Sequence, residues 1–271
     1  MNIKTVNAKN LIVKSKLPAS DYVINPYIGC THKCQYCYAS FMKRFTSHGE
    51  EWGNFVDIKE FPQMYIPKNI SDKTILISSV TDPYQPIEKK YCVTRKILQK
   101  LIGTSCNLEI LTKSHLVTRD IDLFLQFPSI RIGISMNTLN DSFRKDIEPF
   151  ASSVTDRINT LRELHSTRIS TYLFISPIFP GITDVYPLIE ALSPYVNEIC
   201  FENLNLRGKQ IDWVLDYIEQ KYPTLLPLYK EIYLQKKLDY WDELEDSISS
   251  LDNKYKTKFT NYFYHNKIKK K

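Results

Sequence analysis

The residues best suited to chemistry are three cysteines within eight positions, Cys30-Thr-His-Lys-Cys34-Gln-Tyr-Cys37. Thiolates are the usual protein ligands of iron–sulfur clusters, and cysteines at these spacings can hold three corners of a cubane. The fourth iron then has no protein ligand, and an iron with an open coordination position can bind and activate a small molecule. The spacing therefore predicts a reactive [4Fe–4S] centre.

A zinc site is the alternative for the same segment. Cys30, Cys34 and Cys37 could bind Zn²⁺, with His32 or a distant residue as the fourth ligand. Structural zinc sites usually take their ligands from two groups in the sequence, and this chain has no second group. His32 stands between two candidate ligands, where a tight loop is expected to point it outward. The spacing favours the cluster over zinc.

The elements that must position these cysteines belong to a chain of 271 residues, 43% hydrophobic and 13% aromatic. This composition supports a substantial core and argues against global disorder. The first ten residues contain no apolar signal segment, and no apolar run approaches the ~18 residues of a membrane span. We expect a cytoplasmic protein without a membrane partner, in which clustered cysteines favour metal binding over disulfides.

The net charge of +6 at pH 7 is concentrated at the C-terminal end. Residues 254–271 contain seven lysines and no acidic residue, so the rest of the chain is near neutral. Tyr262, Phe263 and Tyr264 lie among these lysines, and a basic aromatic tail can contact phosphates. A frayed, solubilising terminus has the same composition, and both interpretations stay open.

Short β-branched runs alternate with amphipathic helical patterns through the middle of the chain. The predicted strands are residues 22–28, 74–80, 108–112, 130–136, 169–175 and 199–204. The predicted helical faces are residues 93–102, 154–164, 185–192 and 211–218, with a late one at 241–251. Ser153 with Asp156, and Thr183 or Asp184, supply helix starts.

Strands that alternate with helices predict right-handed βαβ units and a parallel sheet of the α/β class. An open doubly wound sheet and a curved partial barrel both fit, and each carries its site at the strands' C-terminal ends. Residues 44–70 are expected to form an ordered excursion over the mouth of the barrel. We predict an N-terminal segment (1–21), a main domain (22–206) and a helical C-terminal extension with a basic tail (207–271).

The cysteine motif, with Tyr36 before its last cysteine, resembles that of the radical S-adenosylmethionine (radical SAM) superfamily. Blocks at the predicted strand ends are similar to those of its spore photoproduct lyase-like branch. They read SVTDPYQP at 79–86, LTKS at 111–114, FPGITD at 179–184 and FENLNL at 201–206. The resemblance spans roughly residues 22–206. It implies an enzyme built on a partial (β/α)6 TIM-like barrel with a helical C-terminal extension.

The resemblance also implies the cofactors. Cys30, Cys34 and Cys37 would hold a [4Fe–4S] cluster, and S-adenosyl-L-methionine (SAM) would bind the fourth iron and be cleaved reductively to a 5′-deoxyadenosyl radical. Tyr36 would flank the adenine. Lys113 and Ser135, at the ends of the third and fourth strands, would hold the SAM carboxylate through charge-assisted hydrogen bonding.

Two positions depart from the family pattern. The superfamily often carries a Gly-Gly-Glu-like segment after the second strand, which contacts the SAM amino group. Residues 78–82 read SSVTD here, so Ser79, Thr81 or backbone carbonyls must serve instead. The repair lyase uses a cysteine near this point as hydrogen donor, and Ser79 aligns there. Because an O–H bond is a poor hydrogen donor compared with S–H, repair of the spore photoproduct by that mechanism is not expected.

The catalytic candidates are Tyr84 and Cys200. Tyr84 follows the second strand beside Asp82 and Gln85, where polar groups meet substrate in barrel enzymes. Turn chemistry explains the same segment equally well. Cys200 lies on the sixth predicted strand and could donate a hydrogen atom if it faces inward. Burial in the core is the alternative for such an isolated cysteine.

The sequence thus predicts a radical SAM enzyme of lyase or oxidoreductase type, with flavodoxin or ferredoxin as electron donor. The branch resemblance and the basic aromatic tail favour a nucleic acid or nucleotide as substrate. A peptide or protein substrate is the first alternative, with residues 44–70 and the C-terminal helices as docking surface. A non-catalytic, zinc-bearing nucleic-acid-binding module is the second.

Overall fold

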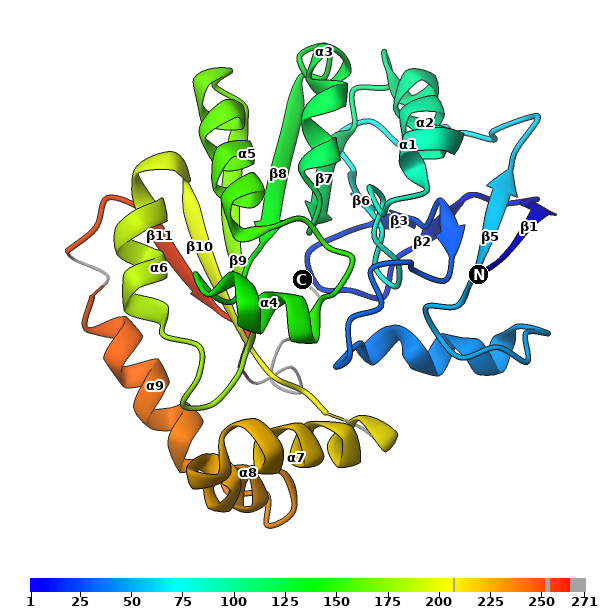
Figure 1. The fold of residues 1–271 in the computed structure, drawn as a ribbon. Coiled ribbons are helices and arrows are strands. Elements are labelled where there is room, and N and C mark those ends of the chain that lie inside the picture. The colour runs from blue at the N-terminus through cyan, green and yellow to red at the C-terminus, as the bar shows by residue number, and fades with distance from the viewer. Residues whose placement is uncertain (207, 252–253, 264–271) are drawn as a thin grey trace.

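One large sheet organises the computed structural model, which describes residues 1–206, 208–251 and 254–263 (Figure 1). Its strands, in chain order, are β2 (Ile12–Lys14), β3 (Tyr22–Ile24), β6 (Thr74–Ile77), β7 (Asn107–Thr112), β8 (Ser129–Ser135), β9 (Ser170–Ile178), β10 (Glu198–Asn203) and β11 (Lys258–Asn261). Their order across the sheet is β11-β10-β9-β8-β7-β6-β3-β2. Neighbouring strands from β3 to β11 are parallel, whereas β2 runs antiparallel to β3.

Helices connect these strands and extend the fold beyond them (Figure 1). The α-helices are α1 (Glu88–Tyr91), α2 (Val93–Leu101), α3 (Ile121–Phe124), α4 (Asp141–Ile147), α5 (Val154–Ser166), α6 (Val185–Leu192), α7 (Lys209–Lys221), α8 (Leu226–Tyr233) and α9 (Asp239–Ser249). The 3-10 helices are η1 (Tyr38–Phe45), η2 (His115–Asp120), η3 (Ser193–Tyr195) and η4 (Pro223–Leu225).

The strand order decides between the two predicted architectures. Strands β3, β6, β7, β8, β9 and β10 follow one another across the sheet in chain order, with helical segments in the connections after β6. A doubly wound sheet would reverse its strand order at a switch point, and no reversal occurs here. The fold is therefore the predicted partial (β/α)6 TIM-like barrel, and the doubly wound alternative is wrong.

Alternation along each strand gives the barrel two different faces. Leu108 and Ile110 of β7 are buried in the core that includes residues of α2, α5 and α6. Glu109, between them, points to the opposite, inner face, where Arg131 of β8 lies 3.6 Å from it and 2.6 Å from Glu198 of β10. We call this inner side the lumen. Arg131, Glu109 and Glu198 form an ionic network within the lumen.

The predicted helix starts are present. The side chain of Ser153 accepts a hydrogen bond from the Asp156 backbone at 3.1 Å and donates to the Asp156 carboxylate at 2.7 Å, which begins α5. Asp184 caps α6 by accepting from the backbone of Tyr186 at 3.1 Å. Both caps satisfy donors that the first turn of a helix leaves without partners. The late amphipathic pattern forms α9, with Trp241 and Ile248 buried.

The predicted strand at 22–28 divides into two. Its first half is β3, and its second half is β4 (Tyr27–Ile28), which joins a separate sheet of order β1-β5-β4 with β1 (Asn2–Asn7) and β5 (Phe55–Glu60). Pro26 stands at the break and has no N–H to donate to a sheet ladder. The strand predicted at 74–80 ends at Ile77, because Ser78 has a φ of 74°.

The chain returns to the large sheet near its C-terminal end. Strand β11 lies parallel to β10, and the backbone N–H of Tyr262 donates to Phe201 at 2.8 Å. The Phe263 ring is 4% exposed and packs against Trp241. This part of the predicted tail is therefore built into the fold, because Tyr262 is hydrogen-bonded to Phe201 and the Phe263 ring is buried. Residues 264–271, with Tyr264 and the last four lysines, lie outside the described part.

Candidate functional site

The three cysteines lie on one loop, residues 29–37, between β4 and η1. All three are half-buried and free of disulfides. Gly29 begins this cysteine loop with a φ of 93°, and a Cβ there would lie 2.4 Å from the Phe55 carbonyl oxygen. Only glycine tolerates both conditions. The small sheet therefore sets the direction in which the loop leaves it.

The segment after β6 holds one side of the cysteine loop. Gln85 accepts hydrogen bonds through Oε1 from the backbone N–H and the hydroxyl of Thr31, at 2.8 and 3.1 Å. Thr81 donates its hydroxyl to the Gly29 carbonyl at 2.6 Å. Gln85 is fully buried, so water does not compete for these hydrogen bonds. The polar residues after β6 thus position the loop itself.

The segment after α4 holds the other side. His32 Nδ1 lies 3.1 Å from the carbonyl oxygen of Phe150, whose N–H donates to the His32 carbonyl at 3.3 Å. The backbone N–H of Gln35 donates to Ile147 at 3.0 Å. His32 is only 2% exposed, so the prediction that it points outward is wrong. The two hydrogen-bonding contacts with Phe150 turn it inward.

A buried ion pair stands behind Tyr36. The Tyr36 hydroxyl donates to the carboxylate of Glu148, which also accepts from the guanidinium of Arg157. Arg157 donates to the Ser135 carbonyl at 2.9 Å as well. Glu148 and Arg157 are 0% and 1% exposed. Burial raises the pKa of Glu148, but Arg157, Lys113 and the Tyr36 hydrogen bond together lower it below its ordinary value, so the carboxylate is ionised.

Asp82 links the end of β7 to the cysteine loop. Its Oδ1 accepts from the Thr112 hydroxyl at 2.6 Å, and its Oδ2 accepts from the Lys113 backbone at 2.9 Å. The same Oδ2 lies 3.2 Å from His32 Nε2. Burial raises the pKa of Asp82, but His32 and these donors lower it to about 2. A single buried carboxylate thereby connects three segments.

Three residues that were predicted to bind SAM come together beside the cysteine loop. Lys113 Nζ donates to the Ser135 hydroxyl at 2.9 Å and lies 6.0 Å from the centre of the Tyr36 ring. Ser135 in turn donates to the Ser176 carbonyl at 3.1 Å. No carboxylate forms an ion pair with Lys113 in the described part of the chain. This cationic group can bind an anion next to Tyr36.

The other two predicted SAM-binding residues, Ser79 and Thr81, lie at the same end of the barrel. Ser79 donates its N–H to Asn25 at 2.9 Å, and its carbonyl accepts from the Tyr38 hydroxyl. The Thr81 hydroxyl is bound to Gly29. Their contacts therefore brace the loop on the side of β3, and their contact with SAM stays a prediction.

The environment of the three thiols suits ligands of a metal cluster. Burial raises the pKa of Cys30, Cys34 and Cys37, and the carboxylates of Asp82 and Glu148 add to the effect at Cys30 and Cys34. N–H groups nonetheless point at the sulfur atoms: the backbone of His32 and Asp82 at Cys30, and the Trp52 indole at Cys37. Such donors stabilise thiolates once a cationic centre removes their protons. The donor set fits an iron–sulfur cluster.

Within the described part of the chain, no group of three or more His, Cys, Asp or Glu side chains is arranged to hold a metal ion. A cubane differs from a single-ion site because its thiolates bind separate iron atoms. In the same residues, no helix combines the length and apolar character needed to cross a membrane.

Tyr84 has a different environment from the one predicted. It is fully buried, and its hydroxyl donates to Asp120 at 3.0 Å. Arg119 and Arg95 pair with the same carboxylate at 2.8 and 2.7 Å. These contacts place the hydroxyl in an ionic network with η2 and α2, so no contact of Tyr84 supports the predicted catalytic role.

Cys200 lies in the lumen, as its candidate role requires. It shares a face of β10 with Glu198 and lies 3.9 Å from the Arg131 guanidinium. It is 2% exposed, and burial together with Glu198 raises its pKa to about 12. The thiol is therefore protonated at neutral pH and carries a transferable hydrogen. Its role as donor stays a prediction.

The sequence reasoning missed the residues that support the loop from behind. Arg157 falls on the apolar face of α5, between Val154 and Leu161, where a charge needs a buried partner. That exception to the helical pattern was a usable signal. Glu148 gave none, because its neighbours form an irregular loop. Tertiary contact alone reveals that it is the partner.

The sequence is similar to those of known proteins. The profile of the Radical SAM superfamily matches residues 24–188. An uncharacterized protein of Methanocaldococcus jannaschii is 42% identical over 253 residues, which cover 93% of this chain and 95% of that one. A radical SAM Nalpha-GlyT isomerase of Pseudomonas phage M6 is 28% identical over 176 residues, 64% of this chain and 37% of the phage protein.

A solved structure shares the fold at low sequence identity. A mutant of spore photoproduct lyase with bound AdoMet and dinucleoside spore photoproduct aligns with a TM-score of 0.63 and 15% sequence identity. The alignment covers 97% of this chain and 82% of that one. The family and the fold expected from the cysteine motif and the strand-end blocks are thus confirmed.

Proposed function

Because this chain belongs to the radical SAM superfamily, we propose that it is an enzyme that holds a [4Fe–4S] cluster on Cys30, Cys34 and Cys37 and cleaves SAM reductively. The observation that carries the proposal is the cysteine loop itself, with three free, half-buried thiols next to Lys113, which forms no ion pair within the described part of the chain. When bound, the cluster supplies one electron to the sulfonium of SAM, which yields methionine and a 5′-deoxyadenosyl radical. Flavodoxin or ferredoxin is the proposed source of that electron.

Lys113 and Ser135 are proposed to bind the carboxylate of SAM. The ammonium group and the hydroxyl already lie 2.9 Å apart, so a carboxylate can accept from both once the Ser135 hydroxyl turns its hydrogen away from the Ser176 carbonyl. Charge-assisted hydrogen bonds of this kind are worth about 2 kcal/mol. The adenine is proposed to pack beside Tyr36, whose ring is fixed by its hydroxyl contact with Glu148.

The substrate is proposed to be a nucleic acid or a nucleotide, transformed by a lyase- or oxidoreductase-type reaction. Exposed aromatic rings and cationic side chains on η1, next to the cysteine loop, support this class. The tail contributes less support than the sequence suggested, because the Phe263 ring is buried.

Anaerobic purification tests the cluster directly. We expect a brown protein with about four iron and four sulfide per chain, and formation of 5′-deoxyadenosine from SAM under reducing conditions. The Cys34→Ala variant should lose the cluster and SAM cleavage together. Cys92→Ala is the matched control, because Cys92 lies outside the loop and should change neither. A colourless protein with stoichiometric zinc would contradict the proposal.

A further inference from the structure

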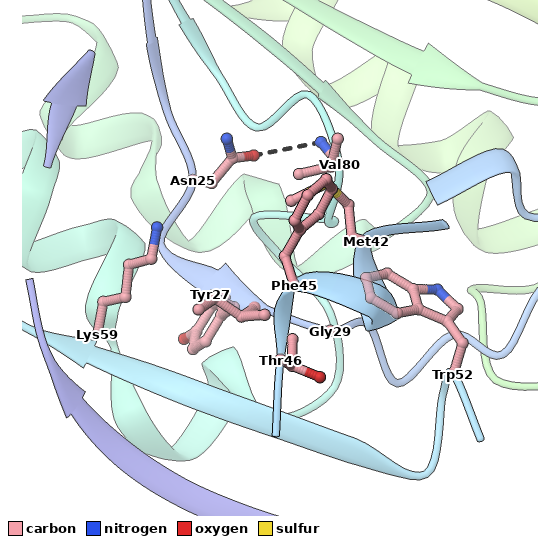
Figure 2. A pocket seen from close by; sticks show the side chains of 10 residues that line it. Asn25, Tyr27, Gly29, Met42, Phe45, Thr46, Trp52, Lys59 and Val80 are labelled. Atoms are coloured by element: carbon pink, nitrogen blue, oxygen red, sulfur yellow. Dashed lines mark hydrogen bonds between the residues drawn. The ribbon is translucent and has the colours of Figure 1, made fainter. Parts of the chain in front are cut away.

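A cavity of about 230 Å³ lies behind the cysteine loop, between η1, the small sheet and the segment after β6 (Figure 2). Its lining residues are Asn25, Tyr27, Ile28, Gly29, Met42, Phe45, Thr46, Trp52, Lys59 and Val80. At ~30 Å³ per water molecule, the space equals roughly eight waters. It is therefore large enough for a phosphate group with its neighbouring sugar atoms.

Lys59 of β5 is the cation of this cavity, and its side chain points into it (Figure 2). Asp57 lies two residues away on the same face of β5. Its carboxylate lies 2.9 Å from His48 Nε2 and forms no ion pair with Lys59. Burial lowers the pKa of the Lys59 ammonium group. A half-buried cation with no anionic partner among the described residues favours an anionic ligand.

Helix η1 carries aromatic rings beside the cavity. Tyr38, Phe41 and Phe45 are 55%, 45% and 67% exposed, although large apolar rings are usually covered. Because residues three apart share a face of a 3-10 helix, Tyr38 and Phe41 lie on one side. We call these three rings, with Arg44, the η1 strip. Phe45 belongs to both the strip and the cavity.

The charge of the η1 strip is complementary to a polyanion. Residues 38–45 contain Lys43 and Arg44 and no acidic residue. The Arg44 guanidinium lies 5.5 Å from the centre of the Phe41 ring and 4.7 Å from that of Phe45. Aromatic rings beside one guanidinium and one ammonium group offer stacking to bases and charge to phosphates, which is how single strands are bound without sequence preference.

We propose that the η1 strip and the Lys59 cavity bind single-stranded nucleic acid, with bases stacked on Phe41 and Phe45 and one phosphate at Lys59. The inference rests on the proposed function and assigns its substrate surface. A strand bound there passes next to Gly29, the residue before Cys30. It would therefore approach the cysteine loop from the side of the small sheet.

The test is a binding measurement on the cluster-loaded protein, without SAM. The probe is a fluorescein-labelled oligothymidylate of about ten nucleotides, followed by anisotropy between roughly 50 and 200 mM salt. We expect Phe41→Ala to weaken binding about tenfold at each salt concentration, because it removes one stacked base. We expect Lys59→Met to weaken binding and to reduce the slope of log K against log[salt] by about 0.7, the value for one phosphate contact on a single strand.

Matched controls separate this surface from general effects. Lys59→Arg keeps the charge and should keep the slope. Tyr186→Ala and Lys100→Met remove an exposed ring on α6 and an exposed lysine on α2, and neither should change binding. The iron content of each variant should equal that of the unchanged protein, because the substituted side chains are exposed or line the cavity.

The outcomes are distinct from those that test SAM cleavage. Equal affinity and equal salt slope in Phe41→Ala, Lys59→Met and the unchanged protein would overturn the inference even if 5′-deoxyadenosine forms normally. A lack of measurable affinity for the oligothymidylate at roughly 50 mM salt would overturn it as well. Loss of SAM cleavage in the unchanged protein would count against the proposed function, and the anisotropy data would still decide the binding surface.

Discussion

His32 and Asp82 face each other inside the protein, with 3.2 Å between His32 Nε2 and Asp82 Oδ2. The histidine belongs to the cysteine loop, and the carboxylate belongs to the segment that follows β6. Through its bonds to Thr112 and Lys113, Asp82 ties the loop to the strand end that carries the proposed SAM-binding lysine. Asp82 is therefore one of the contacts that fix the position of the thiols relative to Lys113.

Asp82→Asn should destabilise the fold by about 3 kcal/mol. The carboxylate accepts hydrogen bonds from Tyr84, Thr112 and Lys113, and the NH₂ group of asparagine would have to face at least one of these donors. Urea unfolding of the protein gives the number. Asp122→Asn is the control, since that side chain is 56% exposed and pairs with Arg95 at the surface. Its cost should stay within about 1 kcal/mol. Equal effects of the two substitutions would contradict the assignment.

Tyr36→Phe should separate the two roles of Tyr36. The variant removes the hydroxyl that donates to Glu148, and should cost about 2 kcal/mol of stability because the acceptor is a buried charge. It keeps the ring, so SAM affinity should change less than about twofold. Tyr36→Ala should weaken SAM binding as well. Calorimetric titration measures the SAM affinity of each variant, and urea unfolding measures its stability. A large loss of SAM affinity in Tyr36→Phe would assign the contact with SAM to the hydroxyl.

Lys113→Met should weaken SAM binding about thirtyfold, the equivalent of about 2 kcal/mol for a charge-assisted hydrogen bond. The measurement is calorimetric titration under anaerobic conditions. Lys96→Met, an exposed lysine on α2, is the control and should leave affinity unchanged. If Lys113→Met binds SAM normally, the carboxylate lies elsewhere.

Gly133→Ala should destabilise the barrel by about 2 kcal/mol, because a Cβ at Gly133 would lie 2.1 Å from the Tyr172 ring. That ring is also packed against the Arg131 guanidinium, 4.1 Å from the ring centre, so it cannot move freely. Gly49→Ala is the control, with nothing within 4 Å of its Cβ. Thermal unfolding should show a lowered midpoint for the first variant only.

Acid should weaken the lumen network through Glu198. Burial raises the pKa of Glu198, but Thr260, Lys258 and Arg131 together lower it below its ordinary value of 4.5. A lowered pKa in the folded state stabilises the fold above the unfolded value, and this contribution disappears as pH falls through the folded value. Glu198→Gln should therefore be less stable than the unchanged protein at pH 7, and the gap should narrow as the pH falls below the ordinary carboxyl value of 4.5. A gap that is independent of pH would contradict this role.

The sequence predicted the parts of the site that depend on local pattern. Cys30, Cys34 and Cys37 are close in the chain, so their spacing alone indicated a shared loop. The alternation of strands and helices predicted the parallel sheet, because buried strands and amphipathic helices have different hydrophobic periods. Lys113 and Ser135 could be placed near each other, since parallel strands end at the same edge of a barrel.

Tertiary structure decided what the chain pattern left open. Strand order excluded the doubly wound sheet. After Pro26, β4 pairs in a second sheet, which the hydrophobic periodicity did not predict. His32 was expected outside and lies inside, because its partners Phe150 and Asp82 are distant in sequence. Local spacing thus determined which residues can hold a cluster. Their support comes from buried charges and carbonyls far along the chain, which meet the loop only when the barrel has formed.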